Sequence, residues 1–152
     1  MIFNLKEIYT YEHANKIRKL LHEEYQDCDL IIFNTFGYTL FLLRELFKTW
    51  KVKELYSELK FIRKTKINGV YSPYTQCAYI FPKYISEEMS EYGEYDMFIA
   101  RCSMVLCHEL RHHLHHKYNR YEKWGDDMIE KDAMKFEIKM FNRFSDEFFG
   151  FK

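Results

Sequence analysis

The residues His108-Glu109-Leu110-Arg111-His112 form an HExxH motif, the stretch of this chain with the clearest chemical meaning. On a helix, positions four apart lie on one face, so His108 and His112 can point at one metal ion. The glutamate beside the first imidazole can then take a proton from a metal-bound water. The motif therefore predicts a zinc site, with His108 and His112 as ligands and Glu109 as the catalytic base.

The neighbourhood of the motif favours this interpretation over a chance match. Residues 98–116 have apolar side chains around much of a helix circumference, which predicts a helix buried between two layers. Imidazoles that border such a surface need partners, because an unsatisfied buried polar group is costly. The alternative is that the histidine-rich tract 112–116 is only a polar helix face.

A catalytic zinc ion usually has three protein ligands, so one must come from outside the motif. We expect it to be Glu130, near the start of the last helix, where Ala133 would allow that helix to approach closely. Two other sets of candidates for the third ligand stay open. Asp126 and Asp127 look more like N-cap residues, and His115 and His116 lie on the motif helix itself.

The motif followed by Glu130-x-x-Ala133 resembles the gluzin-type zincin metallopeptidases, and is most similar to the ImmA/IrrE-type family. The resemblance implies that His108, His112 and Glu130 bind Zn²⁺ and that Glu109 is the catalytic base. It also implies a compact domain with a small sheet before the motif helix. Met134 stands where the family usually has Asp or Asn, which leaves Asp132 or another group to orient a zinc-bound histidine.

The function expected from these residues is that of a zinc-dependent endopeptidase acting on a protein substrate, by the resemblance a transcriptional regulator. The oxyanion would need a donor from among Tyr118, Tyr121, His115 and His116. The segment Thr75 to Phe81 is a candidate edge strand for the substrate, or equally an internal strand. Alternatives are a non-catalytic zincin-fold binding module, and a nucleic-acid-associated protein that uses the basic segment 44–66.

Hydrophobic periodicity predicts the elements that position the site. Helices are expected from Thr10 to Gln26, from Tyr38 to about Lys51, from Ser86 to Glu91, from Asp96 to Lys117, and from Gly125-Asp126 to Phe144. Leu30 to Phe33, Leu59 to Ile67 and Val70 to Phe81 are expected as strands, with a turn at Asn68-Gly69. The predicted fold is therefore α+β and zincin-like: one domain over residues 1–152, mainly helical, with a small, mostly antiparallel sheet before the HExxH helix.

The composition of the chain limits its partners and location. Net charge is zero, so there is no overall bias toward nucleic acid or anionic membranes. The most apolar stretch, 30–43, is too short to span a bilayer, and no signal peptide is evident at the N-terminus. Cys28, Cys77, Cys102 and Cys107 match no metal-binding spacing and are expected as buried thiols. A cytoplasmic protein with no membrane partner is expected.

Overall fold

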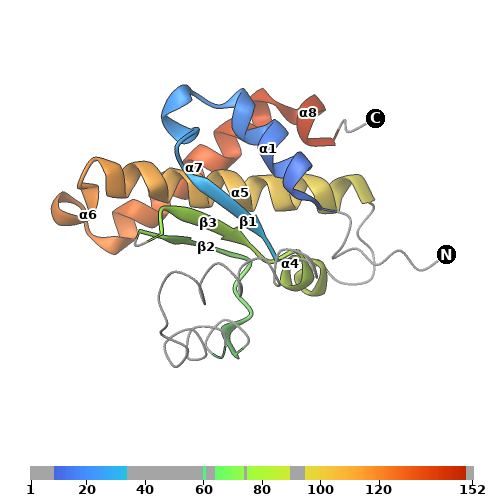
Figure 1. Cartoon of the computed structure of the whole chain (residues 1–152), viewed down its shortest axis with the longest axis horizontal. Helices are drawn as coiled ribbons and strands as arrows, with labels where there is room; N and C mark the ends of the chain where they lie inside the picture. The colour runs from blue at the N-terminus through green and yellow to red at the C-terminus, as the bar shows by residue number, and fades with distance from the viewer. Residues whose placement is uncertain (1–8, 34–59, 61–63, 74, 90–94, 150–152) are drawn as a thin grey trace.

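A computed structural model describes residues 9–33, 60, 64–73, 75–89 and 95–149 (Figure 1). The chain is mainly helical with a small three-stranded sheet, as expected for the α+β class. The expected helix from Tyr38 to Lys51 lies outside the described residues. The described elements are α1 (Tyr11–Leu20), η2 (Glu23–Tyr25), β1 (Asp29–Ile32), β2 (Gly69–Ser72), β3 (Cys77–Ile80), α4 (Pro82–Glu88), α5 (Tyr95–Lys117), α6 (Arg120–Lys123), α7 (Asp126–Arg143) and α8 (Ser145–Phe149).

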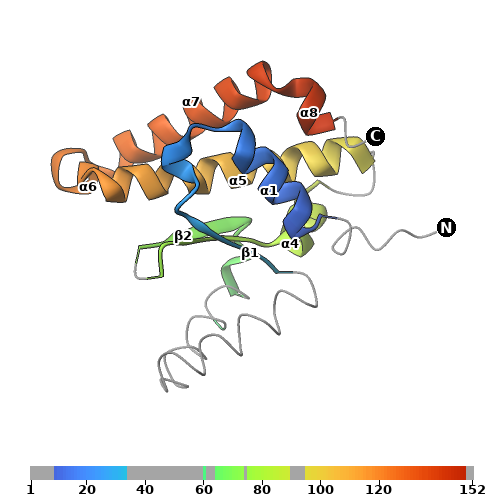
Figure 2. The same cartoon turned by 45° about the horizontal axis from the view of Figure 1, so that its top comes forward.

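Helix α5 carries the HExxH motif and runs through the middle of the molecule (Figures 1 and 2). Its bounds agree with the expected helix from Asp96 to Lys117. The sheet packs on one side of α5, and α1, α7 and α8 pack on the other. Apolar residues lie around most of this helix because both of its sides are covered, and Phe98, Leu106 and Leu110 are almost fully buried. This burial fixes the rotation of α5 and hence the direction of each histidine.

The sheet has the order β1-β3-β2 and is mixed. β2 and β3 form an antiparallel pair, whereas β1 runs parallel to β3, with Asp29 beside Cys77. The expectation of a mostly antiparallel sheet is therefore wrong for one of its two strand pairs. Parallel neighbours need a long connection, and here residues 33–76, which include β2, separate β1 from β3. The expected edge segment from Thr75 to Phe81 contains β3, which is the central strand, so its interpretation as an edge is also wrong.

The segment before β2 departs most from expectation. Lys64 and Thr65 are helical rather than extended, so the expected strand from Leu59 to Ile67 is not formed in its described part. Gly69 does not make a turn with Asn68 but is the first residue of β2. The turn falls instead between β2 and β3, at the interruption that Ser72-Pro73 marks in the expected strand Val70 to Phe81.

Two helix boundaries, the end of α1 and the start of α4, also differ from the predicted ones. Thr10 caps α1 as expected, but α1 ends at Leu20, and His22 then caps the short helix η2 by accepting a hydrogen bond from the backbone N–H of Glu24. Helix α4 begins at Pro82, because proline is favoured in a first helical turn. Ser86 therefore lies inside α4, where its hydroxyl donates to the carbonyl of Lys83 instead of capping the helix.

A short turn reverses the chain between α5 and α7. Asn119 adopts a left-handed conformation with φ 50° and ψ 36°, which asparagine tolerates better than most residues, and α6 follows at once. Gly125 then caps α7, and Asp126 and Asp127 lie in its first turn, where the helix dipole favours acids. The small Ala133 is fully buried where α7 packs on α5, as expected. This packing brings Glu130 beside the motif.

All four cysteines are buried and free. Among the residues that the structure describes, no helix is long and apolar enough to cross a membrane.

Candidate metal centre

Three potential metal-binding side chains meet where α5 and α7 face each other. The Nε2 atoms of His108 and His112 lie 3.1 Å apart. The two carboxylate oxygens of Glu130 lie 3.3 Å from Nε2 of His108 and 3.4 Å from Nε2 of His112. No other such cluster of three His, Cys, Asp or Glu side chains occurs among the described residues. The structure therefore brings together the three residues that the sequence predicts as ligands.

The spacing of these atoms fits a tetrahedral zinc site. Zinc binds nitrogen and carboxylate oxygen at about 2.0–2.2 Å, and two ligand atoms of a tetrahedron are then about 3.3–3.5 Å apart. The two nitrogens are 3.1 Å apart, and each lies 3.3 or 3.4 Å from a different oxygen of Glu130, so these pairwise separations lie close to this range. The side chain of Glu130 is 58% exposed, so the fourth direction opens toward solvent. The donor set of two imidazoles and one carboxylate is one that catalytic zinc sites use.

The charge states of the two histidines suit a cation between them. Burial, reinforced by the nearby positive charges of His108 and His115, lowers the pKa of His112 to about 3. Its imidazole is therefore neutral near pH 7. Burial also lowers the pKa of His108, but the Glu137 hydrogen bond and the charges of Glu109, Glu137 and Glu130 outweigh this effect and raise it. A bound cation would replace the proton that this acidic surrounding attracts to His108.

Glu109 lies on the floor of the same site and is 8% exposed. Burial raises the pKa of its carboxyl group from 4.5 to about 7, although the charge of His108 and the backbone of Tyr71 act to lower it. A pKa near neutrality is the value at which a carboxylate can both accept and return a proton. The position predicted as a general base therefore has the environment that this role requires.

Strand β2 approaches Glu109 so closely that only glycine fits at its first position. A Cβ atom at Gly69 would lie 2.8 Å from Cγ1 of Val105 and 2.9 Å from both Cγ and Oε1 of Glu109. The φ angle of Gly69 is not positive, so the lack of space, rather than backbone conformation, requires glycine here. Gly69 thus lets β2 and α5 enclose the Glu109 carboxylate.

Glu137, which the sequence analysis did not identify, binds the outer nitrogen of His108. Its Oε2 lies 3.1 Å from Nδ1 of His108, and the guanidinium of Arg101 lies 4.0 Å from its other oxygen. A carboxylate at Nδ1 directs Nε2 toward the metal position. Glu137 is two helical turns after Glu130, a spacing that places both on one face of α7. This spacing is the sequence feature from which the role of Glu137 could have been predicted. Met134 is 52% exposed and lines the cavity between them.

The outer nitrogen of His112 faces two other groups. Its Nδ1 lies 3.1 Å from the hydroxyl of Tyr121 and 3.4 Å from Nδ1 of His115. Nε2 of the fully buried His115 in turn lies 2.8 Å from Asp132, whose carboxylate also accepts a hydrogen bond from Nε of Arg111. Asp132 therefore reaches the site through His115 rather than directly, and His115 is engaged away from the cluster of potential ligands.

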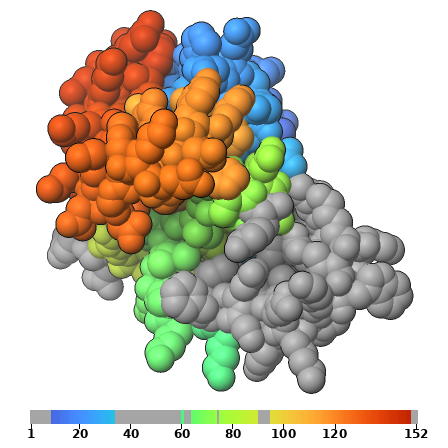
Figure 3. All heavy atoms as spheres, turned by 90° about the vertical axis from the view of Figure 1, so that its left-hand side faces the viewer, coloured from blue at the N-terminus to red at the C-terminus, as the bar shows by residue number. Residues whose placement is uncertain are grey.

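A cavity of about 740 Å³ opens beside these residues, between β2, α5, α6 and α7. Figure 3 views the molecule from the α6 end, where orange residues of the α5–α7 turn lie above the green residues that include β2. Of the four candidate oxyanion donors, only Tyr121 lines the cavity. Tyr118 bonds Glu24 instead, and His116 is an exposed residue near the ring of Tyr71.

The remaining predicted candidates lie away from this site or outside the described part. Asp126 and Asp127 are exposed and do not belong to the cluster of potential ligands. In the basic segment 44–66, only residues 60 and 64–66 are described, and Lys66 at the cavity pairs with Glu87 at 3.2 Å. Comparisons of the chain with protein-family models, with curated proteins and with solved structures gave no match.

Proposed function

We propose that this chain is a zinc-dependent endopeptidase with a zincin-like fold, acting on a protein substrate in the cytoplasm. The observation that carries the proposal is the triangle of His108, His112 and Glu130, whose ligand atoms, one from each residue, all lie within 4.8 Å of one another. The two Nε2 atoms are 3.1 Å apart, and each lies 3.3–3.4 Å from a different oxygen of Glu130, close to the spacing around a tetrahedral zinc ion. Glu109 beside this triangle adds the base that hydrolysis requires. A structural zinc site would usually have four protein ligands and no solvent-facing position.

The residues around the triangle divide the catalytic work. A zinc ion held there would supply Lewis-acid chemistry, polarising the scissile carbonyl and lowering the pKa of water. Glu109 would accept a proton from the attacking water and return it to the leaving amine. Tyr121 has its hydroxyl at the cavity wall, where it can reach the carbonyl oxygen of a bound peptide as well as Nδ1 of His112.

An extended peptide is the substrate shape that the cavity favours. β2 pairs with β3 along one side, and no other described strand pairs with its second side. Three of its residues, Gly69, Val70 and Tyr71, line the cavity. A peptide could add to this edge through main-chain hydrogen bonds and cross the site between β2 and Glu130. The resemblance to ImmA/IrrE-type peptidases makes a transcriptional regulator the first protein to test.

The decisive experiment measures zinc content and peptide cleavage in the same preparations. His108→Ala and Glu130→Ala should lose zinc and turnover, whereas Glu109→Gln should keep zinc and lose turnover. Matched controls are His22→Ala and Glu122→Ala, which change exposed residues away from the cavity. Full zinc occupancy in Glu130→Ala would refute the ligand assignment. Zinc binding without cleavage of any peptide in a diverse fluorogenic pool would favour a non-catalytic binding module.

A further inference from the structure

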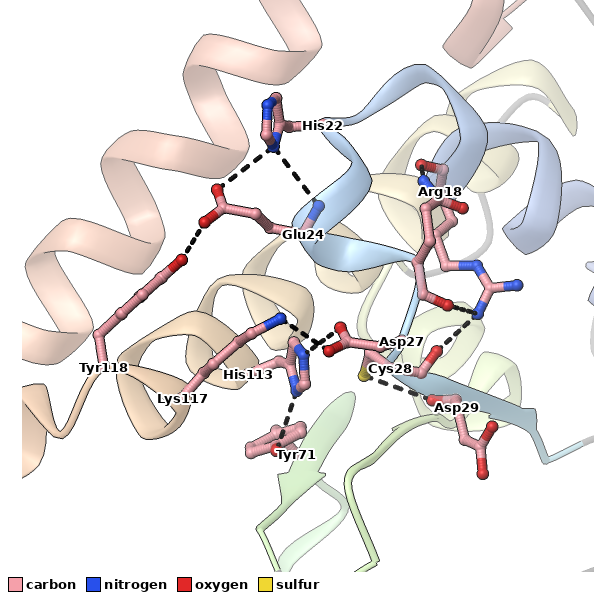
Figure 4. Close-up of polar contacts among 11 residues, drawn as sticks. Arg18, His22, Glu24, Asp27, Cys28, Asp29, Tyr71, His113, Lys117 and Tyr118 are labelled. Carbon is pink, nitrogen blue, oxygen red and sulfur yellow. Dashed lines mark hydrogen bonds and ion pairs between the residues drawn. The ribbon is translucent and has the colours of Figure 1, made fainter.

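Another histidine of α5, His113, links the motif helix to the N-terminal part of the chain. Its Nε2 lies 2.8 Å from Oδ1 of Asp27, and its Nδ1 lies 3.1 Å from the hydroxyl of Tyr71 (Figure 4). Lys117, one turn further along α5, donates to the other oxygen of Asp27 at 2.7 Å. His113 and Tyr71 are buried, with 3% and 8% exposure, so these bonds are shielded from water.

The direction of the bonds to Asp27 follows from its charge. Burial tends to raise the pKa of Asp27, but hydrogen bonds from Lys117 and His113 outweigh it and lower the pKa. Asp27 is therefore an anion that can only accept, so Nε2 of His113 carries a proton. The other ring nitrogen, Nδ1, bonds the hydroxyl of Tyr71. The bonds therefore run from Asp27 at the surface through His113 to Tyr71 in β2.

Tyr71 connects this chain to the proposed catalytic base. Its side chain bonds His113, and β2, to which it belongs, lies directly against Glu109, because a Cβ atom at Gly69 would be 2.9 Å from Cγ and Oε1 of that residue. β2 has four residues and is hydrogen-bonded in the described sheet to β3 alone. The bond from Tyr71 to His113 is a side-chain anchor that ties this short strand to α5. The ring of Tyr71 also meets that of His113 edge-on, with 5.5 Å between centroids.

We propose that Asp27, His113 and Tyr71 form a positioning chain that holds β2, and through its close contact Glu109, in the orientation needed for hydrolysis. This inference rests on the proposed function, because it assigns the chain a role in placing the base. The three residues bond none of the atoms of His108, His112 or Glu130 that converge on the metal position. Breaking the chain should therefore reduce kcat and leave both KM and zinc content nearly unchanged.

The test compares two tyrosines whose hydroxyls each bond a residue far away in the sequence: Tyr71 in β2 and Tyr118, which follows α5. Tyr71→Phe removes the hydroxyl that bonds His113 and keeps the ring. Tyr118→Phe removes a hydroxyl that bonds Glu24 at the surface, in the same region of the molecule but without a link to Glu109 (Figure 4). In zinc-loaded protein with a fluorogenic peptide pool, we expect kcat to fall about tenfold in Tyr71→Phe and less than twofold in Tyr118→Phe.

A second pair of variants separates positioning from charge. Asp27→Ala removes the acceptor for His113 and should reduce kcat as Tyr71→Phe does. Asp27→Asn keeps a side-chain oxygen that can still accept from Nε2, so it should restore most of kcat. Equal losses in Asp27→Asn and Asp27→Ala would overturn the proposal. A changed KM with an unchanged kcat in Tyr71→Phe would also overturn it.

Hydrogen exchange of the Tyr71 amide provides a measurement that needs no turnover. In zinc-free protein, this amide should exchange at least several-fold faster in Tyr71→Phe and Asp27→Ala than in wild type or Tyr118→Phe. If wild type cleaves no peptide, the proposed function fails, and so does the assignment of a catalytic role to the chain. If wild type cleaves peptides but the Tyr71 amide exchanges at the same rate in all variants, only the positioning chain fails.

Discussion

Gly69→Ala tests how closely β2 and α5 must approach to place Glu109. The added Cβ would lie 2.8–2.9 Å from atoms of Val105 and Glu109, whereas ordinary contacts of this kind are 3.4–4 Å. Neither neighbour is the free end of a flexible chain, because Val105 is short and Glu109 is met at Cγ as well as Oε1. The strand must therefore shift, or the carboxylate must leave its place.

The expected loss of stability follows from two opposing effects. Overpacking of a well-filled interior costs about 1–3 kcal/mol. Replacing glycine by alanine at a compatible backbone angle returns about 0.4–1 kcal/mol by restricting the unfolded chain. We expect a net loss of about 1–2 kcal/mol, which for a chain of this length lowers Tm by about 3–6 °C. A displaced carboxylate should lower kcat/KM about tenfold or more, since a shift of about 1 Å can cost a hundredfold.

Three measurements on zinc-loaded Gly69→Ala test this reasoning: the thermal transition, kcat/KM on fluorogenic peptides, and zinc content. Zinc content should not change, because the three atoms nearest to the added Cβ belong to Val105 and Glu109 and not to a proposed ligand. Gly125→Ser is the control, since a Cβ there meets nothing within 4 Å and a serine improves the helix cap. Adding Val105→Ala should relieve the contact of the new Cβ with Val105 but not its contact with Glu109, and so should not restore turnover. Wild-type turnover and Tm in Gly69→Ala would refute the argument.

Three further predictions concern the outer partners and the charge of the site. Glu137→Ala should weaken zinc binding about 10–100-fold, measured by competition with a chromogenic chelator, because Nδ1 of His108 loses its carboxylate; an unchanged Kd would exclude Glu137 from this role. Met134→Asp should change the Kd for zinc by less than about twofold, because the carboxylate of Glu137 already bonds Nδ1 of His108. A tenfold gain in zinc affinity would mean that an acid at position 134 orients the histidine better than Glu137 does. In zinc-free protein, Glu109→Gln should increase the free energy of unfolding in urea by about 3 kcal/mol at pH 8 and by almost nothing near pH 4.5. The reason is that folding raises the pKa of this buried acid from 4.5 to about 7, so its ionisation destabilises the fold progressively as pH rises through that range. Equal stability of the two proteins at pH 8 would contradict this prediction.

The helices that carry the site could be predicted because their signals are local. The apolar pattern of residues 95–117 gives α5 within one residue, and Gly125 with two following aspartates gives the start of α7. The pairing of Glu130 with the motif also followed from a local feature, since the small Ala133 allows close approach. Whether these residues bind zinc stays a prediction, which the proposed metal analysis tests.

The features that sequence analysis missed depend on contacts between distant segments. The Asn68-Gly69 pair has the composition of a hairpin turn, but the reason for Gly69 is the side chain of Glu109, forty residues later. The parallel pairing of β1 with β3 depends on the path of a long connection, which no local pattern encodes. Glu137 was missed because its role requires the rotation of α7 about its own axis, and that rotation is set by packing against α5.

The histidine-rich tract of α5 is better explained by packing than by solvation. A polar helix face would leave its imidazoles exposed, yet His112, His113 and His115 are 7%, 3% and 0% exposed. Successive helical positions differ by about 100° in direction, so neighbouring histidines must face different segments. The buried imidazoles, together with His108, each meet a carboxylate that lies elsewhere in the chain: His108 meets Glu137 and Glu130, His112 meets Glu130, His113 meets Asp27 and His115 meets Asp132.

Such repeated pairing lets one buried helix carry many polar groups without leaving them unsatisfied. Only at His108 and His112 do two imidazoles converge on the same carboxylate, that of Glu130. The other pairs connect α5 to the segment before β1 through Asp27, and to α7 through Asp132 and Glu137. If the triangle binds zinc, these pairs hold in place the elements from which its ligands and its base project. Substitutions at His113 or His115 should then loosen the site without removing a ligand, which distinguishes them from substitutions at His108 or His112.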